Sequence, residues 1–542
     1  MQILILVLAI GIVLHDQEGL GPPTVSLEGL WPWLGLAVAA PLLLAAGYGL
    51  LCRLTLRRMQ RGAGVRAIRL LDHITIAYRL LAAGLYLTIL ATGGLVMLRQ
   101  TLGMQRWILV DELLVMAPTL ALVAWSWLAY FPIDRRLRQT SVLSRLDAGL
   151  PVHPVLSLRQ YTVLQLRHQV ALLGAPLLVL MIWHEVVRLY VPDRAVGMGL
   201  TAQNLMLLGG SAVVFLLAPV MLRHIWDTAP LPPGDLRERL MEMCRHYKIG
   251  VRELLLWRTF GGMINAAVMG LVAPLRYILL TDGLLETMPA RQVEAVMAHE
   301  LAHIRKRHMA WLIVAALACF QVLSLFWHGL FTLALQQQDT ASVAAIAGLG
   351  FDLRRWLNDP GTMELAVIIA SGLSWIEVFG WMSRRFERQA DTFAVQHLAR
   401  QRLKENDDVK GLLFNSSPSP EEVGRGVTSA INPGQGEIPA KLEDEHGRAW
   451  TRKAELVTQP RIDAGSVLTM VQALQAVADL NNIRTHRRSW RHGSIAWRQQ
   501  YLRELVGQRL DAQRIDRLMI ALNFGCLAAL VGGIWVESWM VG

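Results

Sequence analysis

Long apolar runs separated by polar stretches dominate the hydrophobic pattern of this chain. A helix that crosses a bilayer needs about 20 predominantly apolar residues. The chain has nine apolar runs, and seven of them meet or approach this length. The eighth, 170–191, is weaker because charged residues interrupt it, and the ninth, 3–14, is short. We interpret the ninth as a first span, because it lacks the basic start and cleavage site of a signal peptide. The other seven runs meet or approach the required length and cover residues 31–52, 80–98, 113–133, 195–222, 309–335, 365–382 and 518–536.

This pattern predicts a mostly α-helical, polytopic membrane protein with about eight or nine transmembrane helices. Composition supports it, because 53% of the 542 residues are hydrophobic and 18% are charged, against about 25% charged in soluble chains. A soluble enzyme and a disordered chain are thereby excluded. The four cysteines have no paired spacing, so we expect buried hydrophobes and no disulfide scaffold.

The net charge of +11 comes from loops that we place in the cytoplasm. Residues 53–79 carry seven Arg and residues 134–169 carry six, whereas the alternate loops carry two or fewer. Basic loops remain inside, so the long polar stretches 223–308 and 383–517 also face the cytoplasm. We therefore expect lipid, and no nucleic acid, as the partner of this charge. The use of 47 Arg against six Lys is typical of a GC-rich bacterial genome and suggests a bacterial inner membrane.

A zinc-binding pattern lies in the first polar stretch. His299, Glu300 and His303 fall on a segment whose apolar residues recur at helical spacing after Pro289. Two imidazoles at i and i+4 share one helix face and can bind one zinc ion. Glu300 can then take a proton from a water molecule at the metal, which attacks a peptide carbonyl. A similar pair, His184 and Glu185, lacks the second His and is discounted.

A catalytic zinc site needs a third protein ligand. One clan supplies a third His six residues after the second with a Gly midway, but Met309 and Lys306 occupy those positions. Glu387, just after the run 365–382 and on the same side of the membrane, is our third ligand. Asp391, one helical turn later, can accept the outer N–H of a ligating His.

Three blocks of the chain resemble the integral-membrane zinc metallopeptidases typified by the HtpX heat-shock protease and the CAAX prenyl endopeptidase. They are residues 265–303, which end in the His-Glu-Leu-Ala-His motif, residues 383–391 and residues 492–498. The resemblance implies a gluzincin-type peptidase domain with a small β-sheet, one Zn²⁺ per chain, and protein or peptide substrates. It supports Glu387 as the third ligand.

The resemblance also implies roles for residues outside the zinc motif. The segment 265–270 is similar to the edge strand along which substrate pairs, and Asn265 matches a residue that holds substrate near the metal. His492 matches a His that steadies the oxyanion, and Arg498 assists. Departures are Gly493 in place of Pro, Arg388 in place of an aromatic residue, and Arg307 and His308 in place of Asn and Asp. None of them removes a ligand.

The domain organisation follows from these blocks. The N-terminal membrane region covers 1–222, and the two peptidase parts, 223–308 and 383–517, flank a pair of helices at 309–382. Residues 402–460 lack periodicity, so we expect a mobile insertion there, and 518–542 form the last span.

Three other interpretations remain open. A sensor peptidase of the BlaR type places a similar zinc helix in the cytoplasm, but it needs a large outer domain that no loop here can hold. A non-catalytic scaffold would not need His299, Glu300, His303 and Glu387 together. Transport is a further alternative, since Glu185 and Glu377 are charges within spans.

Overall fold

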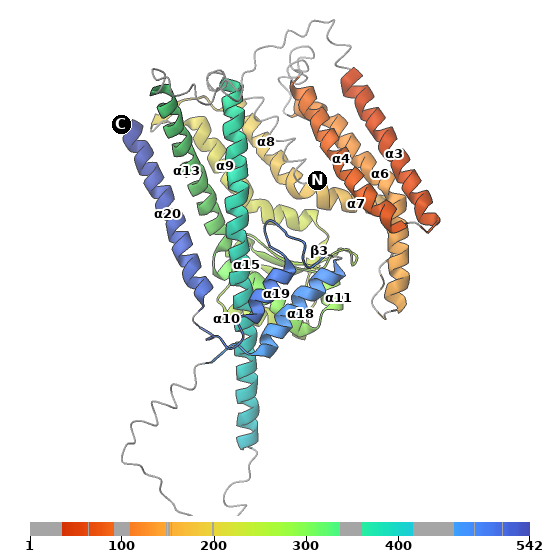
Figure 1. Ribbon diagram of the computed structural model, residues 1–542, viewed down its shortest axis with the longest axis vertical. Coiled ribbons are helices and arrows are strands. Elements are labelled where there is room, and N and C mark those ends of the chain that lie inside the picture. The colour runs from red at the N-terminus through yellow and green to blue at the C-terminus, as the bar shows by residue number, and fades with distance from the viewer. Residues whose placement is uncertain are drawn as a thin grey trace, which may run out of the picture. The chain divides into compact units, whose positions relative to one another are not determined.

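The computed structural model describes residues 35–91, 109–336, 360–415 and 460–541, apart from a few isolated positions. These residues are mostly helical and include a small mixed sheet, so the expected fold class is confirmed (Figure 1). The chain forms two compact units. Unit 1 comprises Met1–Leu231, Val251–Gly261 and Met269–Glu286, and unit 2 comprises Pro232–Gly250, Gly262–Val268 and Thr287–Gly542.

Seven helices of the described residues are long and apolar enough to cross a membrane. The weak run 170–191 belongs to one of them, whereas the run 3–14 lies outside the described residues and the run 365–382 is part of a longer helix. The seven candidate spans are Ala37–Gln60, Arg66–Leu90, Val110–Thr140, Leu158–Tyr190, Ala202–Ile225, His308–Gly329 and Arg514–Val536.

In unit 1, helices α3 (Ala40–Gln60), α4 (Gly64–Ala91) and α6 (Val110–Asp147) pack side by side (Figure 1). Their core includes Tyr48 and Tyr86. Two boundaries differ from the sequence prediction, because the basic stretches expected as long loops are largely helical. Apolar side chains at helical spacing continue through the arginines, so α4 starts at residue 64 instead of 80 and α6 continues to residue 147.

The next candidate spans begin at polar caps. In α7 (Leu158–Gln165), Ser157 and Gln160 form a capping box, and the helix continues through η4 (Leu166–Ala171) into α8 (Leu172–Tyr190). The run predicted to begin at residue 195 first forms the hairpin β1 (Ala195–Gly197) and β2 (Leu200–Thr201). The Thr201 side chain accepts a hydrogen bond from Asn204 N, which caps α9 (Ala202–Ile225). The helix therefore starts seven residues later than predicted.

The four-stranded sheet has the order β3-β4-β6-β5, with bounds Thr228–Pro230, Glu253–Trp257, Tyr277–Thr281 and Ala266–Met269 respectively. β3 pairs with β4 antiparallel and β4 pairs with β6 parallel, in register Glu253↔Tyr277. β6 is buried throughout, as expected of a central strand. The order places β5 at an edge, as the resemblance implies for this segment. Short helices η5 (Ala273–Leu275) and α11 (Asp282–Thr287) flank β6 in sequence.

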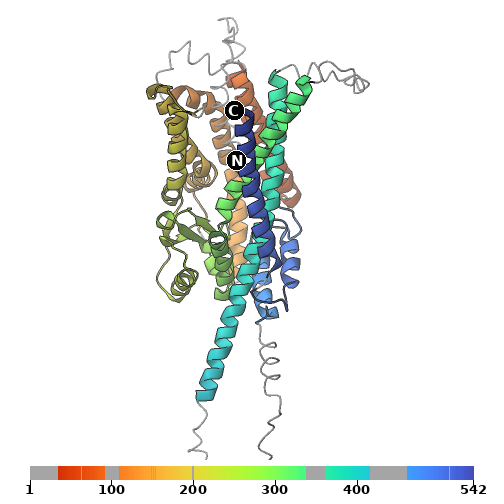
Figure 2. The same ribbon diagram turned by 90° about the vertical axis from the view of Figure 1, so that its left-hand side faces the viewer.

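In unit 2, the long helices α13 (His308–Gln336), α15 (Pro360–Asn415) and α20 (Arg514–Val541) lie side by side (Figures 1 and 2). Their contact is apolar and includes Met382, Phe386 and Met519. α15 extends the prediction, because residues 402–415, expected within an insertion, continue the helix. Leu, Lys and Glu in this stretch are good helix formers, and the remainder of the insertion lies outside the described residues.

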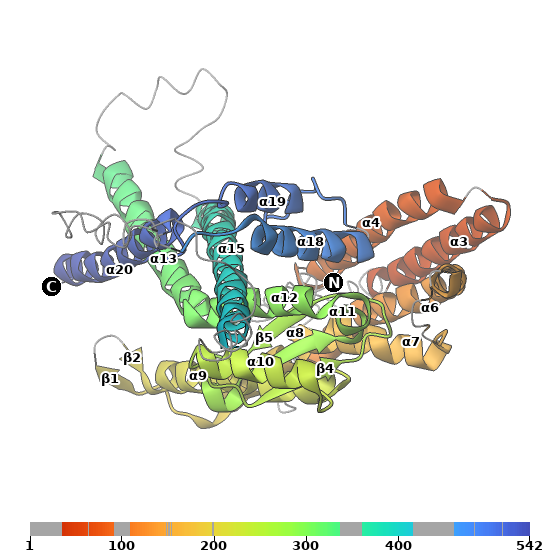
Figure 3. The ribbon, with the colours of Figure 1, turned by 90° about the horizontal axis from the view of Figure 1, so that it is seen from below.

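Four shorter helices complete unit 2: α10 (Asp235–His246), α12 (Ala290–Arg305), α18 (Ala464–Leu480) and α19 (Ile495–Arg503). α12, α18 and α19 all pack against α15 (Figure 3). Segments almost 200 residues apart in sequence are thereby held on one stretch of a single helix.

Candidate metal centre

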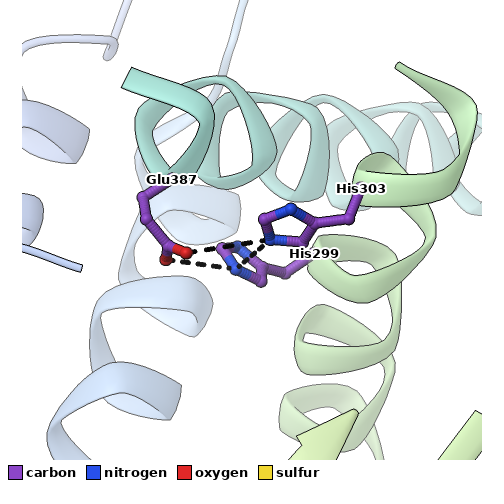
Figure 4. A group of neighbouring side chains, drawn as sticks. All are labelled: His299, His303 and Glu387. Carbon is purple, nitrogen blue, oxygen red and sulfur yellow. Dashed lines mark hydrogen bonds and ion pairs between the residues drawn. The ribbon is translucent and has the colours of Figure 1, made fainter. Parts of the chain in front are cut away.

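The two motif histidines lie on α12 and face Glu387 on α15 (Figure 4). His299 Nε2 is 3.3 Å from His303 Nε2, and Glu387 oxygens lie 3.5 Å from the former and 3.9 Å from the latter. One ligand atom from each residue falls within 4.8 Å of the others. The structure therefore brings together the three residues that were predicted as ligands.

The outer nitrogen of His299 lies against a buried charge pair. His299 Nδ1 is 2.9 Å from Asp391 Oδ1. Arg498 on α19 donates from Nε and Nη2 to the two oxygens of Asp391, at 2.8 and 2.6 Å, and its Nη1 lies 3.0 Å from Glu387 Oε2. Asp391 is thus placed beside a ligating His, as its spacing suggested. Arg498 therefore contacts the carboxylates of both Asp391 and the ligand Glu387.

The outer nitrogen of His303 has a different support. His303 Nδ1 lies 2.9 Å from His308 Nδ1, and His308 Nε2 lies 3.0 Å from Gln389 Oε1. Since the amide oxygen can only accept, His308 Nε2 donates to it, and the neutral His308 accepts at Nδ1 from His303. The amide group of Gln389 donates to Asp516 at 2.6 Å, which also accepts from Lys306 at 2.8 Å. Four residues therefore form a row behind His303: His308, Gln389, Asp516 and Lys306. We call the two members nearest the metal, His308 and Gln389, the neutral support, and we call Asp391 with Arg498 the charged support.

Helical spacing alone would not identify His308. In a continuous α-helix, residues i and i+5 point about 140° apart, so His308 would face away from His303. The helix instead ends at Arg305 with Lys306 as its C-cap, and Arg307 adopts a left-handed conformation with φ 55°. This break turns the chain so that His308, the first residue of α13, faces back to the metal centre. In the sequence, His308 stood out only because it replaces the Asp that the family often has at this position.

The charges of the centre shift its pKa values in opposite directions. Burial opposes ionisation of Glu387 and Asp391, but Arg498 outweighs it and lowers the pKa of both. Burial lowers the pKa of His303 well below its usual range, and the neighbouring His299 adds to this. For His299 the carboxylates of Asp391 and Glu387 outweigh burial and raise the pKa to about 10. Without metal, His299 is therefore protonated, and this proton supplies the positive charge that a metal ion would otherwise bring.

Glu300, between the two histidines in sequence, is only partly buried by its neighbours. Burial raises its pKa to about 7, and the negative charge of Glu387 contributes, against the positive charges of His299, His492 and Arg498. A carboxyl group with this pKa exchanges protons near neutral pH.

His492 also reaches the centre. It precedes α19, and its Nδ1 donates to Glu387 Oε1 at 2.8 Å, while half of its side chain is exposed. Gly493 has φ +74° and closes a tight loop through hydrogen bonds with Ser489 in both directions. Proline, with φ near −65°, could not adopt this conformation. The glycine at this position is therefore required by the loop that presents His492.

Asn265 is the remaining predicted site residue. It is exposed and directly precedes β5. Its neighbour Ile264 is held by Asn481, the C-cap residue of α18. The Asn481 side chain accepts from Ile264 N at 3.0 Å and donates to Ile264 O at 2.8 Å. The start of the edge strand is thus fixed to the helices of unit 2.

The residues present fit a zinc ion. Two imidazole nitrogens and one carboxylate oxygen are the ligand types of catalytic zinc sites. Nitrogens about 2.0–2.1 Å from a tetrahedral ion stand roughly 3.4 Å apart, close to the 3.3 Å between the two Nε2 atoms. Because His303 donates its Nδ1–H to His308, its Nε2 carries the lone pair that a metal ion needs.

Comparison with known proteins agrees with this chemistry. Residues 235–428 match the family model described as peptidase family M48, and the matched segment contains both histidines, Glu300 and Glu387. Residues 235–428 thus carry the sequence features of peptidase family M48. Among solved structures, it is similar to Ste24p of S. mikatae, with 13% identity and a TM-score of 0.39 over 87% of this chain and 99% of that chain. No curated protein matches the chain.

The M48 match, together with the seven candidate spans of the described residues, indicates a membrane-bound metalloprotease that acts on peptide substrates. Peptidases of this family are zinc-dependent, and the His-His-Glu cluster provides the residues for one ion. The predictions of an enzyme and of an integral membrane protein are confirmed.

Proposed function

We propose that His299, His303 and Glu387 bind one Zn²⁺ and that Glu300 is the general base of an endopeptidase. The observation that supports this most strongly is the convergence of three ligand atoms within 4.8 Å, with the outer nitrogen of each histidine held by a separate partner. Zinc bound there would polarise the scissile carbonyl and make water acidic. Metal-ligating histidines commonly have such partners.

Glu300 moves the protons in this proposal. Its carboxylate takes a proton from the attacking water and then delivers it to the nitrogen of the leaving amine. A pKa of about 7 suits both steps near neutral pH, because the group is neither too weak as a base nor too weak as an acid.

The remaining residues position the ligands and the substrate. Arg498 contacts the carboxylates of both Asp391 and Glu387, so we propose that it assists by fixing them. His492 donates its Nδ1–H to Glu387. To stabilise an oxyanion as well, it must donate from Nε2, which requires a second proton on the ring. Asn265 stands at the start of edge strand β5, where an extended peptide can add by backbone pairing.

We place the site on the cytoplasmic face of a bacterial inner membrane. Basic residues at helix ends support this orientation: Arg57 and Arg58 end α3, and Arg305 and Lys306 precede the candidate span of α13. Membrane proteins with cytoplasmic segments, or misfolded proteins, are the proposed substrates, on analogy with the family.

A paired assay tests the proposal. Wild type, Glu300→Gln and Glu387→Gln are purified in detergent, depleted of zinc and reloaded, and cleavage of an unfolded protein is followed together with zinc content. We expect Glu300→Gln to bind zinc and to lose activity by about 10²- to 10⁴-fold, whereas Glu387→Gln loses zinc. The exposed Glu242→Gln on α10 is the matched control and should behave as wild type. A wild type that binds no zinc would sink the ligand assignment and favour the scaffold or transport alternative.

A further inference from the structure

A loop of unit 2 carries an arginine cluster that the metal centre does not use. Residues 484–491 include Arg484, Arg487, Arg488 and Arg491, all exposed. Arg384 of α15 donates a hydrogen bond to this loop, and Arg385 follows it in sequence. These six arginines are called the exit surface below. None of them forms an ion pair with a carboxylate within the described part of the chain.

The loop contacts α15 over a short stretch of that helix. Arg384 donates to the carbonyl oxygen of Trp490 at 2.7 Å, and the Trp490 ring lies 5.4 Å from that of Phe379. Gly380 permits this approach, since a Cβ there would stand 2.9 Å from the Trp490 oxygen. The exit surface therefore lies beside residues 379–385 of α15.

That level coincides with the ends of membrane-spanning helices. Met382 and Phe386 of α15 pack with Ala315 of α13 and with Met519 of α20, and the candidate spans of these two helices begin at His308 and Arg514. The apolar run 365–382 of α15 ends here as well. Just before it, Leu373 and Ile376 are 60% and 47% exposed, as expected of side chains that face lipid.

Aromatic rings and guanidinium groups alternate on this surface. Arg385 stacks on Trp381 with its Cζ 3.4 Å from the ring centre, and Arg491 lies over Phe379 at 5.8 Å. Trp490 is 48% exposed. Tryptophan is enriched where hydrocarbon meets headgroups, and a guanidinium fork binds phosphate oxygens in pairs.

We propose that the exit surface binds the phosphodiester headgroups of anionic phospholipids in the membrane that holds the chain. Juxtamembrane arginine clusters attract such lipids with about a fivefold gain per arginine. The aromatic residues and the level on α15 favour lipid over a soluble anion, because both place the guanidinium groups at the headgroup layer. The proposal does not depend on the peptidase assignment, although His492 follows Arg491 directly.

Headgroup photolabelling tests it. The full-length protein is placed in phosphatidylcholine vesicles with a trace of phosphatidylglycerol or phosphatidylcholine bearing a headgroup diazirine. Labelling of the chymotryptic peptides that cover 484–491 is measured for each probe. We expect wild type to favour the anionic probe by tenfold or more, and R484Q/R487Q/R488Q to reduce this preference by up to about 10²-fold.

A matched variant controls for net charge. R245Q/R503Q/R509Q removes three exposed arginines of the same unit. They neighbour Tyr247, Tyr501 and Leu510, which contact α15 at His397, Thr392 and Gln396, about 15 Å or more beyond Met382 along the helix. This variant should label as wild type does, and thermal melting of all three proteins checks that they fold.

Three outcomes would overturn the proposal. Wild type could label equally with both probes, or the control variant could lose as much preference as the test variant. Excess inorganic phosphate or an acidic peptide could also displace the anionic probe, which would assign the surface to a free anion or to a polypeptide.

Discussion

His299 and His303 lie one turn apart on α12, yet their outer nitrogens have opposite surroundings. Asp391 faces His299 and is neutralised by Arg498, so that side of the centre is a network of buried full charges. On the other side the uncharged His308 faces His303, and the uncharged Gln389 contacts His308 from behind. Full charges appear there only at Asp516 and Lys306, which are partly exposed.

This difference separates two tasks. The charged support compensates for burying Glu387 and Asp391, and it raises the basicity of His299. The neutral support adds no charge and selects the tautomer of His303 whose Nε2 faces the metal. We therefore expect the charged side to control the stability of the fold, and the neutral side to control metal affinity alone.

The largest expected effect comes from breaking the charged side. Arg498→Leu removes the guanidinium group that two buried carboxylates share, which costs about 3–5 kcal/mol of unfolding free energy. Chemical denaturation of the zinc-free protein measures it. Arg503→Leu, at an exposed position of the same helix, should cost about 0.5 kcal/mol or less. An Arg498→Leu protein as stable as wild type would remove the distinction between the two sides.

A histidine outside both supports adds a pH dependence that must be separated from theirs. His397 is buried on α15 and contacts Tyr247 Oη through Nδ1 at 2.9 Å. Burial lowers its pKa to about 4 from the ordinary 6.5, aided by the positive charges of His246 and Arg400. The unfolded chain binds the proton first, so stability falls as the pH drops from 6.5 towards 4, by about 3 kcal/mol in this group.

His397→Asn tests that contribution, because an amide oxygen can still accept from Tyr247 but cannot titrate. The difference in unfolding free energy between wild type and variant should shrink as the pH drops from 7 to 4. A difference that stays constant across this range would show that His397 does not govern the acid loss, and the carboxylates beside Arg498 would then account for it.

Breaking the neutral side should have a smaller effect, confined to the metal. His308→Leu removes the acceptor for His303 Nδ1–H, so we expect zinc affinity to fall about 10- to 100-fold. His308→Asn, whose amide oxygen can occupy the position of Nδ1, should restore most of it. Competition with a chelator gives the affinity, and the melting temperature of the zinc-free protein reports the fold. Equal losses in both variants would mean that His308 only fills space.

How far the sequence predicts this centre depends on the spacing of its residues. The pair His299 and His303 follows from one helical turn. Glu387, more than 80 residues further on, was chosen because it follows an apolar run on the same side of the membrane, and the family resemblance supported that choice. Neither argument could pair Arg498 with Asp391, because no local pattern joins α19 to α15. His308 was missed for a different reason: the left-handed Arg307 breaks the helix on which spacing arguments rest.

The fold shows the same division. Apolar runs located the candidate spans, since hydropathy acts on each helix separately. Their ends were misplaced at α4 and α6, where arginines continue a helix that the loop interpretation ended. The capped start of α9 at Thr201 and the extension of α15 to Asn415 were also missed, because caps and helix propensity decide these ends.

The smallest effect is expected at the outer end of the row behind His303. Lys306 donates to Asp516, but both side chains are partly exposed, at 33% and 25%, and such pairs contribute about 0.2–1 kcal/mol. Asp516 also accepts from Gln389, so Lys306→Gln leaves the amide of Gln389 in place and its oxygen directed at His308. Zinc affinity should therefore change by less than about threefold, and stability by less than about 1 kcal/mol. Measured beside His308→Leu in the same chelator competition, a loss as large as that of His308→Leu would mean that the orientation of His303 depends on the whole row. The tautomer of His303 would then be controlled from the exposed end of this row, and the separation between a charged and a neutral side would fail.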